Sequence, residues 1–127
     1  MHNIQQTLFI IQAELAGADK KVGDEKVADL EKLIDKIEKT LPPIKTFFIS
    51  GGTELAATFD VARTIARRAE RRVVQVSEDH STSSGQGGVK IGPETLKYLN
   101  RLSSILYALA RLSNHLSGIT EEPPSYK

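Results

Sequence analysis

Apolar residues recur along this chain at alternating spacings of three and four positions, which is typical of helices that bury one face. Four segments carry such a stripe, with a period of about 3.5 residues. Its members are Ile4, Leu8, Ile11, Leu15 and Ala18 in the first segment, Val27, Leu30, Ile34, Ile37 and Leu41 in the second, Leu55, Phe59, Ala62, Ala66, Ala69, Val73 and Val76 in the third, and Leu99, Leu102, Leu106 and Leu109 in the fourth. Helices of this kind bury their stripes against one another. We therefore predict an all-α, up-and-down bundle of four helices, folded as a single domain over residues 1–127.

Helix-breaking and helix-capping residues fall between these segments. Asp24 is placed to cap the second helix, which the Pro42–Pro43 pair should end. Thr53 follows a Gly-Gly pair and can cap the third helix, which is expected to run as far as Val76. Pro93 suits the first turn of the fourth helix.

Three segments do not fit the helical pattern. Residues 77–92 are polar and rich in glycine, and we expect a long mobile loop there. Residues 120–127 form a tail that should be disordered or lie over a neighbour. Residues 44–49, IKTFFI, could form a strand, but no partner strand is evident. An extended linker in which Phe47 and Phe48 are packed is therefore the favoured interpretation.

The composition is that of an ordinary globular protein, with 39% hydrophobic and 26% charged residues. No apolar run is long enough to cross a membrane, and the start of the chain is too polar for a signal peptide. Cysteine is absent, which excludes disulfides and thiolate metal sites. We expect a cytoplasmic protein that does not bind a membrane.

Charge is concentrated in one place. Residues 63–72 contain five arginines, namely Arg63, Arg67, Arg68, Arg71 and Arg72, and one acid, Glu70, although the whole chain has a net charge of only +1. A single basic helix in an otherwise acidic chain indicates a discrete anion site, whereas a nucleic-acid-binding chain tends to be basic more widely. We therefore expect no nucleic-acid partner.

Helical spacing places Arg63, Arg67, Glu70 and Arg71 on one face, with Arg68 and Arg72 in a second row beside it. Like charges four positions apart destabilise a helix by about 0.2–0.5 kcal/mol per pair, so this pattern does not serve helix stability. Arginine presents a planar fork of donors that matches phosphate oxygens. The spacing alone leaves two interpretations open: a polyanion site, or a structural role as a solvated charged face or an intersubunit salt-bridge network.

Asn100 begins a polar face on the fourth helix that continues through Ser104, Tyr107, Arg111 and Asn114. A plain exposed stripe is the favoured interpretation, because a functional one requires this face to converge on the arginine face. The histidines have no partner at helical spacing, so we predict no metal site.

The residues 61–74, VARTIARRAERRVV, together with LKYLNRLS at 96–103 and LYALAR at 106–111, closely resemble the PduO-type ATP:cob(I)alamin adenosyltransferases. The segment FFISGGT at 47–53 resembles a Phe-x-x-Pro-Gly-Gly motif of that family, with Ser50 in place of the proline. The resemblance covers nearly the whole chain apart from residues 77–92 and the tail.

The resemblance implies a cobalamin adenosyltransferase-like helical bundle that assembles as a homotrimer with active sites between subunits. The implied reaction transfers the 5′-deoxyadenosyl group of ATP, bound with Mg²⁺, to a reduced cobalamin or other corrinoid and releases triphosphate. Cobalt in its Co(I) state would act as the nucleophile. The protein would hold the triphosphate and make the corrinoid easier to reduce.

The resemblance also implies roles for individual residues. ATP would be bound by Arg67, Arg71 and Asn100, supported by Arg68 and Glu70. The residues expected to carry catalysis are Arg67, which contacts phosphate, Arg63, which is held at the subunit interface, and Phe47, which crowds the lower face of the cobalt.

The family's N-terminal Thr/Gly/Asp-rich segment, which wraps ATP, and its first helix have no counterpart in this sequence. We therefore expect weak or no adenosyltransferase activity from this chain alone. The alternative function is a non-catalytic trimeric module that binds ATP or corrinoid.

Overall fold

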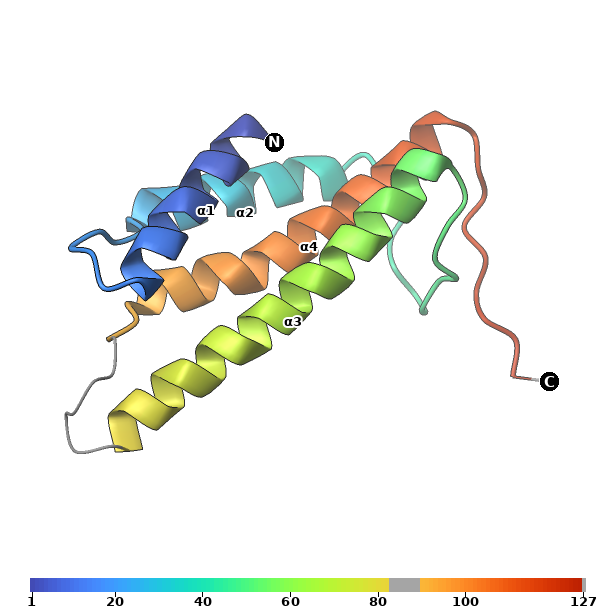
Figure 1. Cartoon of the computed structure of the whole chain (residues 1–127). Helices are drawn as coiled ribbons and strands as arrows, with labels where there is room; N and C mark the ends of the chain where they lie inside the picture. Colours follow the sequence, from blue (N-terminus) through green and yellow to red (C-terminus); the bar gives the residue numbers. More distant parts are fainter. Residues whose placement is uncertain (83–89, 127) are drawn as a thin grey trace.

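The computed structural model of the protein describes residues 1–82 and 90–126, and for residues 80–82 it describes only the backbone. Four helices make up the described chain: α1 (His2–Leu15), α2 (Asp24–Glu38), α3 (Glu54–Thr82) and α4 (Pro93–Leu116). No strand occurs in these residues, so the prediction of an all-α bundle is confirmed. Helix α4 lies at the centre, with α3 antiparallel along one side and α1 and α2 on the other (Figure 1).

The core forms around α4 because its apolar stripe is wide enough to face helices on both sides. Ile105 is fully buried at the middle of this stripe. The other α4 residues of the core are Tyr98, Leu99, Leu102, Leu106 and Ala108. They meet Leu30, Ile34 and Ile37 of α2, Ile4 and Ile11 of α1, and Ala66 and Val73 of α3. The small Ala66 is buried between α3 and α4 and lets the two helices pack closely.

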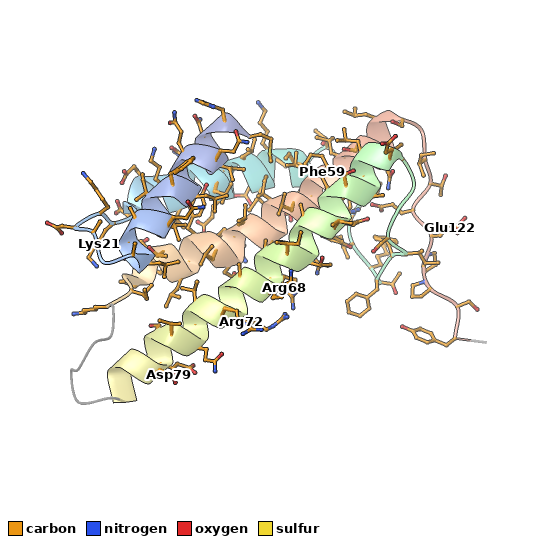
Figure 2. All side chains as sticks on the ribbon, in the orientation of Figure 1. Lys21, Phe59, Arg68, Arg72, Asp79 and Glu122 are labelled. Atoms are coloured by element: carbon orange, nitrogen blue, oxygen red, sulfur yellow. The ribbon has the colours of Figure 1, made fainter. Side chains whose placement is uncertain are left out.

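One side of α3 remains uncovered by the described chain. Val61, Ile65 and Val76 of this helix have exposed fractions of 59%, 52% and 46%. Figure 2 shows the arginine-bearing middle of α3 running along the outside of the bundle. Helix α3 therefore has one side packed on α4 and another, partly apolar side turned away from it.

The helix starts follow the sequence with one exception. The Ala56 amide donates to the Thr53 hydroxyl oxygen at 3.1 Å, which confirms Thr53 as the cap of α3. Pro93 opens α4 as expected. Asp24, however, does not cap α2, because the capping residue is Gly23 and Asp24 is the first helical residue. An acidic side chain in the first turn still suits the positive end of the helix dipole.

The predicted loop starts too early, since α3 continues through residues 77–82 to Thr82. No glycine or proline occurs in this stretch, and extending an existing helix by one residue costs little. The remainder of the predicted loop up to residue 89 lies outside the described residues.

Residues 44–49 form neither a helix nor a strand, as the linker interpretation predicted. The tail runs beside this linker, and the Ile49 amide donates to the Glu122 carbonyl at 2.8 Å (Figure 1). Phe48 is partly buried, whereas Phe47 is 79% exposed, so the expectation that both rings are packed is wrong for Phe47. None of the described helices is long and apolar enough to cross a membrane.

Candidate functional site

A cavity of about 360 Å³ lies where the arginine face of α3 meets α4. Its lining residues are Arg67, Glu70, Arg71, Val74, Gln75 and Glu78 of α3 and Asn100 of α4. The polar face of α4 therefore converges on the arginine face at Asn100, which the functional interpretation required. Three residues expected to bind ATP, namely Arg67, Arg71 and Asn100, line this one cavity.

Hydrogen bonds fix the orientation of Asn100 in this cavity. Its amide nitrogen donates to the Glu70 carboxylate at 3.0 Å, and its amide oxygen accepts from Arg101 at 2.8 Å. Glu70 was expected to support the ATP site, and in this structure its carboxylate holds the Asn100 amide. The lining holds two guanidinium groups, of Arg67 and Arg71, and two carboxylates, of Glu70 and Glu78. The fork of donors on each arginine, and not a net positive charge, is what suits this cavity to a phosphate.

A second cavity, of about 640 Å³, lies at the start of α3. The linker residues Ile44, Lys45, Thr46, Phe47, Phe48 and Ser50 line it, together with Asp60, Arg63 and Tyr107. The Arg63 guanidinium stacks over the Tyr107 ring at 5.2 Å from its centroid, an attractive cation–π contact. Phe47 contributes an exposed apolar ring to this cavity, which Arg63 also lines.

The two cavities follow one face of one helix. Arg63 lines the cavity that contains Phe47, and Arg67, one turn further along, lines the cavity that contains Asn100. Because an α-helix rises 1.5 Å per residue, Arg63 and Arg71 are separated by about 12 Å along the axis. A ligand of nucleotide size can therefore reach from one cavity to the other.

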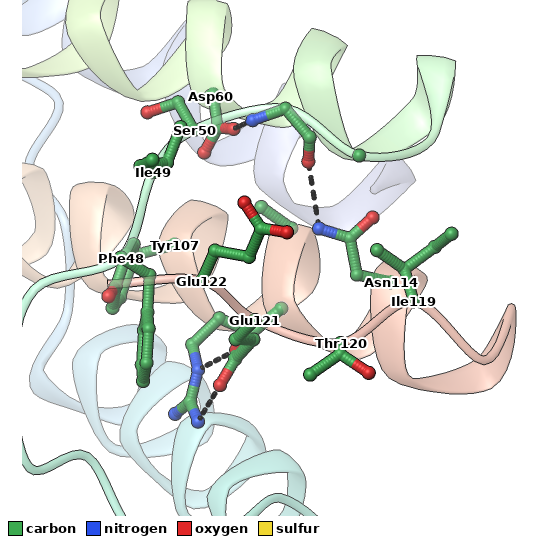
Figure 3. Close-up of a pocket in the computed structure, with 14 residues that line it drawn as sticks. Phe48, Ile49, Ser50, Asp60, Tyr107, Asn114, Ile119, Thr120, Glu121 and Glu122 are labelled. Carbon is green, nitrogen blue, oxygen red and sulfur yellow. Dashed lines mark hydrogen bonds and ion pairs between the residues drawn. The ribbon is translucent and has the colours of Figure 1, made fainter. Parts of the chain in front are cut away.

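The turn before α3 holds the linker against α4. Gly51 and Gly52 have φ values of 109° and 98°, a region that favours glycine. The Asn114 side chain accepts from the Thr53 amide at 2.9 Å. It also donates to the Gly51 carbonyl at 2.8 Å (Figure 3). The Gly51 amide donates to the Asp60 carboxylate at 2.9 Å. A Cβ on Gly52 would come within 2.3 Å of the Asn114 oxygen, so only glycine fits there.

Arg111 is a site residue whose environment the sequence reasoning misjudged. It is only 5% exposed, so the plain exposed stripe is wrong at this position. Hydrogen bonding to Glu121 raises the pKa of Arg111 above its ordinary value, in spite of burial, which acts in the opposite direction. The available signal was its position between Ala110 and Leu112, since a charge within an apolar run needs a buried partner.

Arg68 and Arg72 form the second row on α3 and line neither of these cavities (Figure 2). Arg68 was expected to support the ATP site, and the structure leaves it exposed on a different side of the helix from Arg67. In the described part of the chain, no group of three or more histidine, cysteine, aspartate or glutamate side chains could hold a metal ion.

The family model described as cobalamin adenosyltransferase matches residues 1–113. The PduO corrinoid adenosyltransferase of Citrobacter freundii is 37% identical over 122 residues, and the corrinoid adenosyltransferase of Bacillus subtilis is 39% identical over 120 residues. The chain therefore belongs to the cobalamin adenosyltransferase family.

Solved structures give the type within the family. A variant of the PduO-type ATP:corrinoid adenosyltransferase of Lactobacillus reuteri, complexed with cobalamin and ATP, matches with a TM-score of 0.85 and 32% identity over 98% of this chain. Another variant of that enzyme, complexed with ATP, matches with a TM-score of 0.83 and 33% identity. The chain is thus a PduO-type family member.

The match spans only part of the relatives. It includes 91% of this chain but 34% of the Citrobacter protein and 58% of the Bacillus protein. It covers 66% of the Lactobacillus reuteri chain that is complexed with cobalamin and ATP.

Proposed function

We propose that this chain transfers the 5′-deoxyadenosyl group from ATP to a reduced corrinoid and releases triphosphate. The observation that carries the proposal is the placement of Arg63 and Arg67 one turn apart on α3, each in a different cavity. One cavity offers arginines and an amide, and the other offers an apolar ring. This pairing suits one polyanionic and one large, partly apolar substrate.

In this proposal the triphosphate of ATP occupies the cavity of Arg67, Arg71 and Asn100. As the bond between C5′ and the triphosphate oxygen breaks, negative charge builds up on the leaving group. Arginines that are already in place stabilise that charge where it develops. Their bidentate donors also orient the triphosphate. The Lactobacillus reuteri neighbours, which are complexed with ATP, support this assignment.

The corrinoid occupies the cavity of Phe47, Arg63 and Tyr107 in this proposal. An apolar ring against the lower face of the cobalt excludes water and other axial ligands. Four-coordinate cobalt is easier to reduce to Co(I), so Phe47 promotes formation of the nucleophile without itself reacting. In the transfer step, the cobalt electron pair forms the bond to C5′, and the electrons of the breaking C5′–O bond leave with the triphosphate.

A binding module without turnover is the second candidate. It is favoured by the lining of the ATP cavity, which among the described residues comes from α3 and from Asn100 of α4 alone. Fast catalysis requires a substrate to be enclosed and held in a reactive geometry. A cavity lined by two neighbouring helices can bind ATP without meeting that requirement.

We also propose that the chain forms a homotrimer in the cytoplasm. The exposed apolar side chains Val61 and Ile65 on α3 support association with a further protein surface. Light scattering coupled to size-exclusion chromatography measures the number of chains, and cell fractionation measures the location.

Turnover separates the two functions. The purified chain is incubated with ATP, Mg²⁺ and chemically reduced cobalamin, and adenosylcobalamin and triphosphate are quantified. Equal amounts of both products support the transferase. Binding of both substrates without product supports the module. A chain that binds neither ATP nor cobalamin contradicts both functions.

A further inference from the structure

The buried arginine of α4, Arg111, contacts both the tail, ten residues further along the chain, and the segment that follows α2. Its guanidinium makes a bidentate pair with the Glu121 carboxylate in the tail, with one of the two bonds measuring 3.0 Å. It also donates to the Pro42 carbonyl, beyond the end of α2, at 2.9 Å. Its remaining face covers the Phe48 ring at 5.4 Å from the centroid. We refer to Arg111 and Glu121 together as the Arg111 clamp.

The linker at residues 44–49 depends on such contacts, because it has no helix or strand hydrogen bonds of its own. Phe47 itself is 79% exposed, so little of its own surface fixes its position. Its neighbour Phe48 is held under Arg111, and Ile49 is hydrogen-bonded to the tail at Glu122. The placement of the Phe47 ring is therefore set by contacts on the residues that follow it.

The tail reaches the linker through the same clamp. Glu121 binds Arg111 (Figure 3). The next residue, Glu122, accepts the hydrogen bond from the Ile49 amide at 2.8 Å. A charge pair that is largely removed from water holds its partners in one geometry, especially when the arginine fork is fully engaged. Releasing Glu121 would therefore free the tail, the Phe48 ring and the Ile49 amide together.

We propose that Arg111 and Glu121 are positioning residues for the corrinoid site, which hold the linker so that Phe47 faces its cavity. This inference rests on the proposed function, because the clamp acts on the cavity that the proposed function gives to the corrinoid, and not on the cavity that it gives to ATP. The clamp lines a separate cavity of about 250 Å³ and contributes nothing to the lining of the Arg67 cavity. Loss of the clamp should therefore weaken corrinoid binding and leave ATP binding intact.

The test compares Glu121→Gln with its neighbour Glu122→Gln in the full chain. Both changes remove one negative charge from the tail, but only the first removes the partner of Arg111. Arg111→Lys keeps the charge and loses the planar fork, so it should behave as an intermediate case. Circular dichroism and urea unfolding establish that each variant is folded before it is compared.

The first readout needs no ligand: hydrogen exchange at the Ile49 amide, followed by NMR. Glu121→Gln should speed this exchange at least about tenfold, and Glu122→Gln should change it less than about twofold, because the Glu122 carbonyl remains in place. The second readout is titration with cob(II)alamin in the presence of ATP. Glu121→Gln should weaken cobalamin binding about tenfold and reduce the fraction of four-coordinate cobalt, with ATP affinity unchanged.

The outcomes separate the clamp from the proposed function. If the unaltered chain binds cobalamin and Glu121→Gln matches Glu122→Gln in both readouts, the clamp is overturned and the proposed function stands. If the Arg111–Glu121 pair only stabilises the fold, Glu121→Gln should lower the free energy of unfolding and weaken the binding of ATP and of cobalamin equally. That result also overturns the clamp. An unaltered chain that binds no cobalamin overturns the proposed function, and the corrinoid role of the clamp with it, whatever the exchange rates.

Discussion

Glu14, near the end of α1, caps the first turn of α4 by accepting a hydrogen bond from the Gly92 amide at 2.9 Å. The same carboxylate accepts from the Thr95 hydroxyl and lies 3.5 Å from the Lys21 ammonium group. The Glu14 side chain is only 2% exposed. This buried cap ties the helix that carries Asn100 to the first helix of the chain, so it sets where α4 begins relative to the rest of the bundle.

Replacing Glu14 with alanine should therefore destabilise the fold. The Gly92 amide and the Thr95 hydroxyl would lose their acceptor in a buried place, at a cost of about 1–3 kcal/mol. The free energy of unfolding is measured by urea denaturation. The matched control is Glu31→Ala on α2, an exposed helical glutamate whose loss should change stability by less than about 0.5 kcal/mol. Equal effects of the two changes would show that the cap contributes nothing.

Tyr98 gives the protein a pH dependence on the alkaline side. Burial raises the pKa of its phenol, and a hydrogen bond with Thr7 offsets part of that shift. Because the folded state holds the phenol proton more tightly than the unfolded state, protonated Tyr98 contributes to stability. This contribution is complete below the ordinary tyrosine pKa of about 10 and is lost as the pH rises through the pKa of Tyr98 in the folded state. Urea unfolding at a series of alkaline pH values should show a smaller decline in Tyr98→Phe. Tyr126→Phe, at a 90% exposed tyrosine, should leave the decline unchanged.

Neighbouring arginines on α3 provide a test of the ATP site. Arg71→Ala and Arg67→Ala should each weaken ATP binding about 10- to 100-fold, since a charge-assisted hydrogen bond contributes about 1.5–3 kcal/mol. Arg72→Ala should change it less than about twofold, because Arg72 does not line the cavity. Calorimetric titration with ATP measures all three. A similar loss in Arg72→Ala would mean that diffuse charge attracts ATP and that no built site exists.

Two exposed phenylalanines test the corrinoid site. Phe47→Ala should weaken cob(II)alamin binding and abolish the spectral signature of four-coordinate cobalt. Phe9→Ala on α1, with a ring that is 72% exposed compared with 79% for Phe47, should leave both unchanged. The melting temperature should move little in either variant, because neither ring is in the core. A normal four-coordinate signal from Phe47→Ala would remove that residue from the site.

The sequence predicted the four helices because each has an unbroken apolar stripe of helical period. It placed the end of α3 too early, since Ser77, Glu78 and Asp79 carry no apolar signal although they continue the helix. Polar residues at a helix end look alike in sequence whether they are helical or not. No glycine or proline occurs in residues 77–82, so nothing in this stretch of the sequence ends the helix.

The sequence predicted some residues of the candidate site and missed the roles of others, for a physical reason. Helical spacing placed Arg67 and Arg71 on one face but did not show what that face binds, and the roles of Arg67, Arg71 and Asn100 came from the family resemblance. The role of Arg111 depends on Glu121 and Phe48, which reach it from segments without regular structure. No periodicity relates such segments to a helix, so their contacts appear only when the chain is folded. The same holds for Asn114, which holds the Gly51 turn from 63 residues away.

The central claim is that the Arg67 cavity and the Phe47 cavity form one site. The most direct measurement is the absorbance spectrum of cob(II)alamin with the chain, recorded with and without saturating ATP. The account expects four-coordinate cob(II)alamin to form with ATP present, and to be strongly reduced with Arg67→Ala at the same ATP concentration. A cobalt spectrum that does not respond to ATP, at concentrations that saturate ATP binding to the same sample, would contradict it.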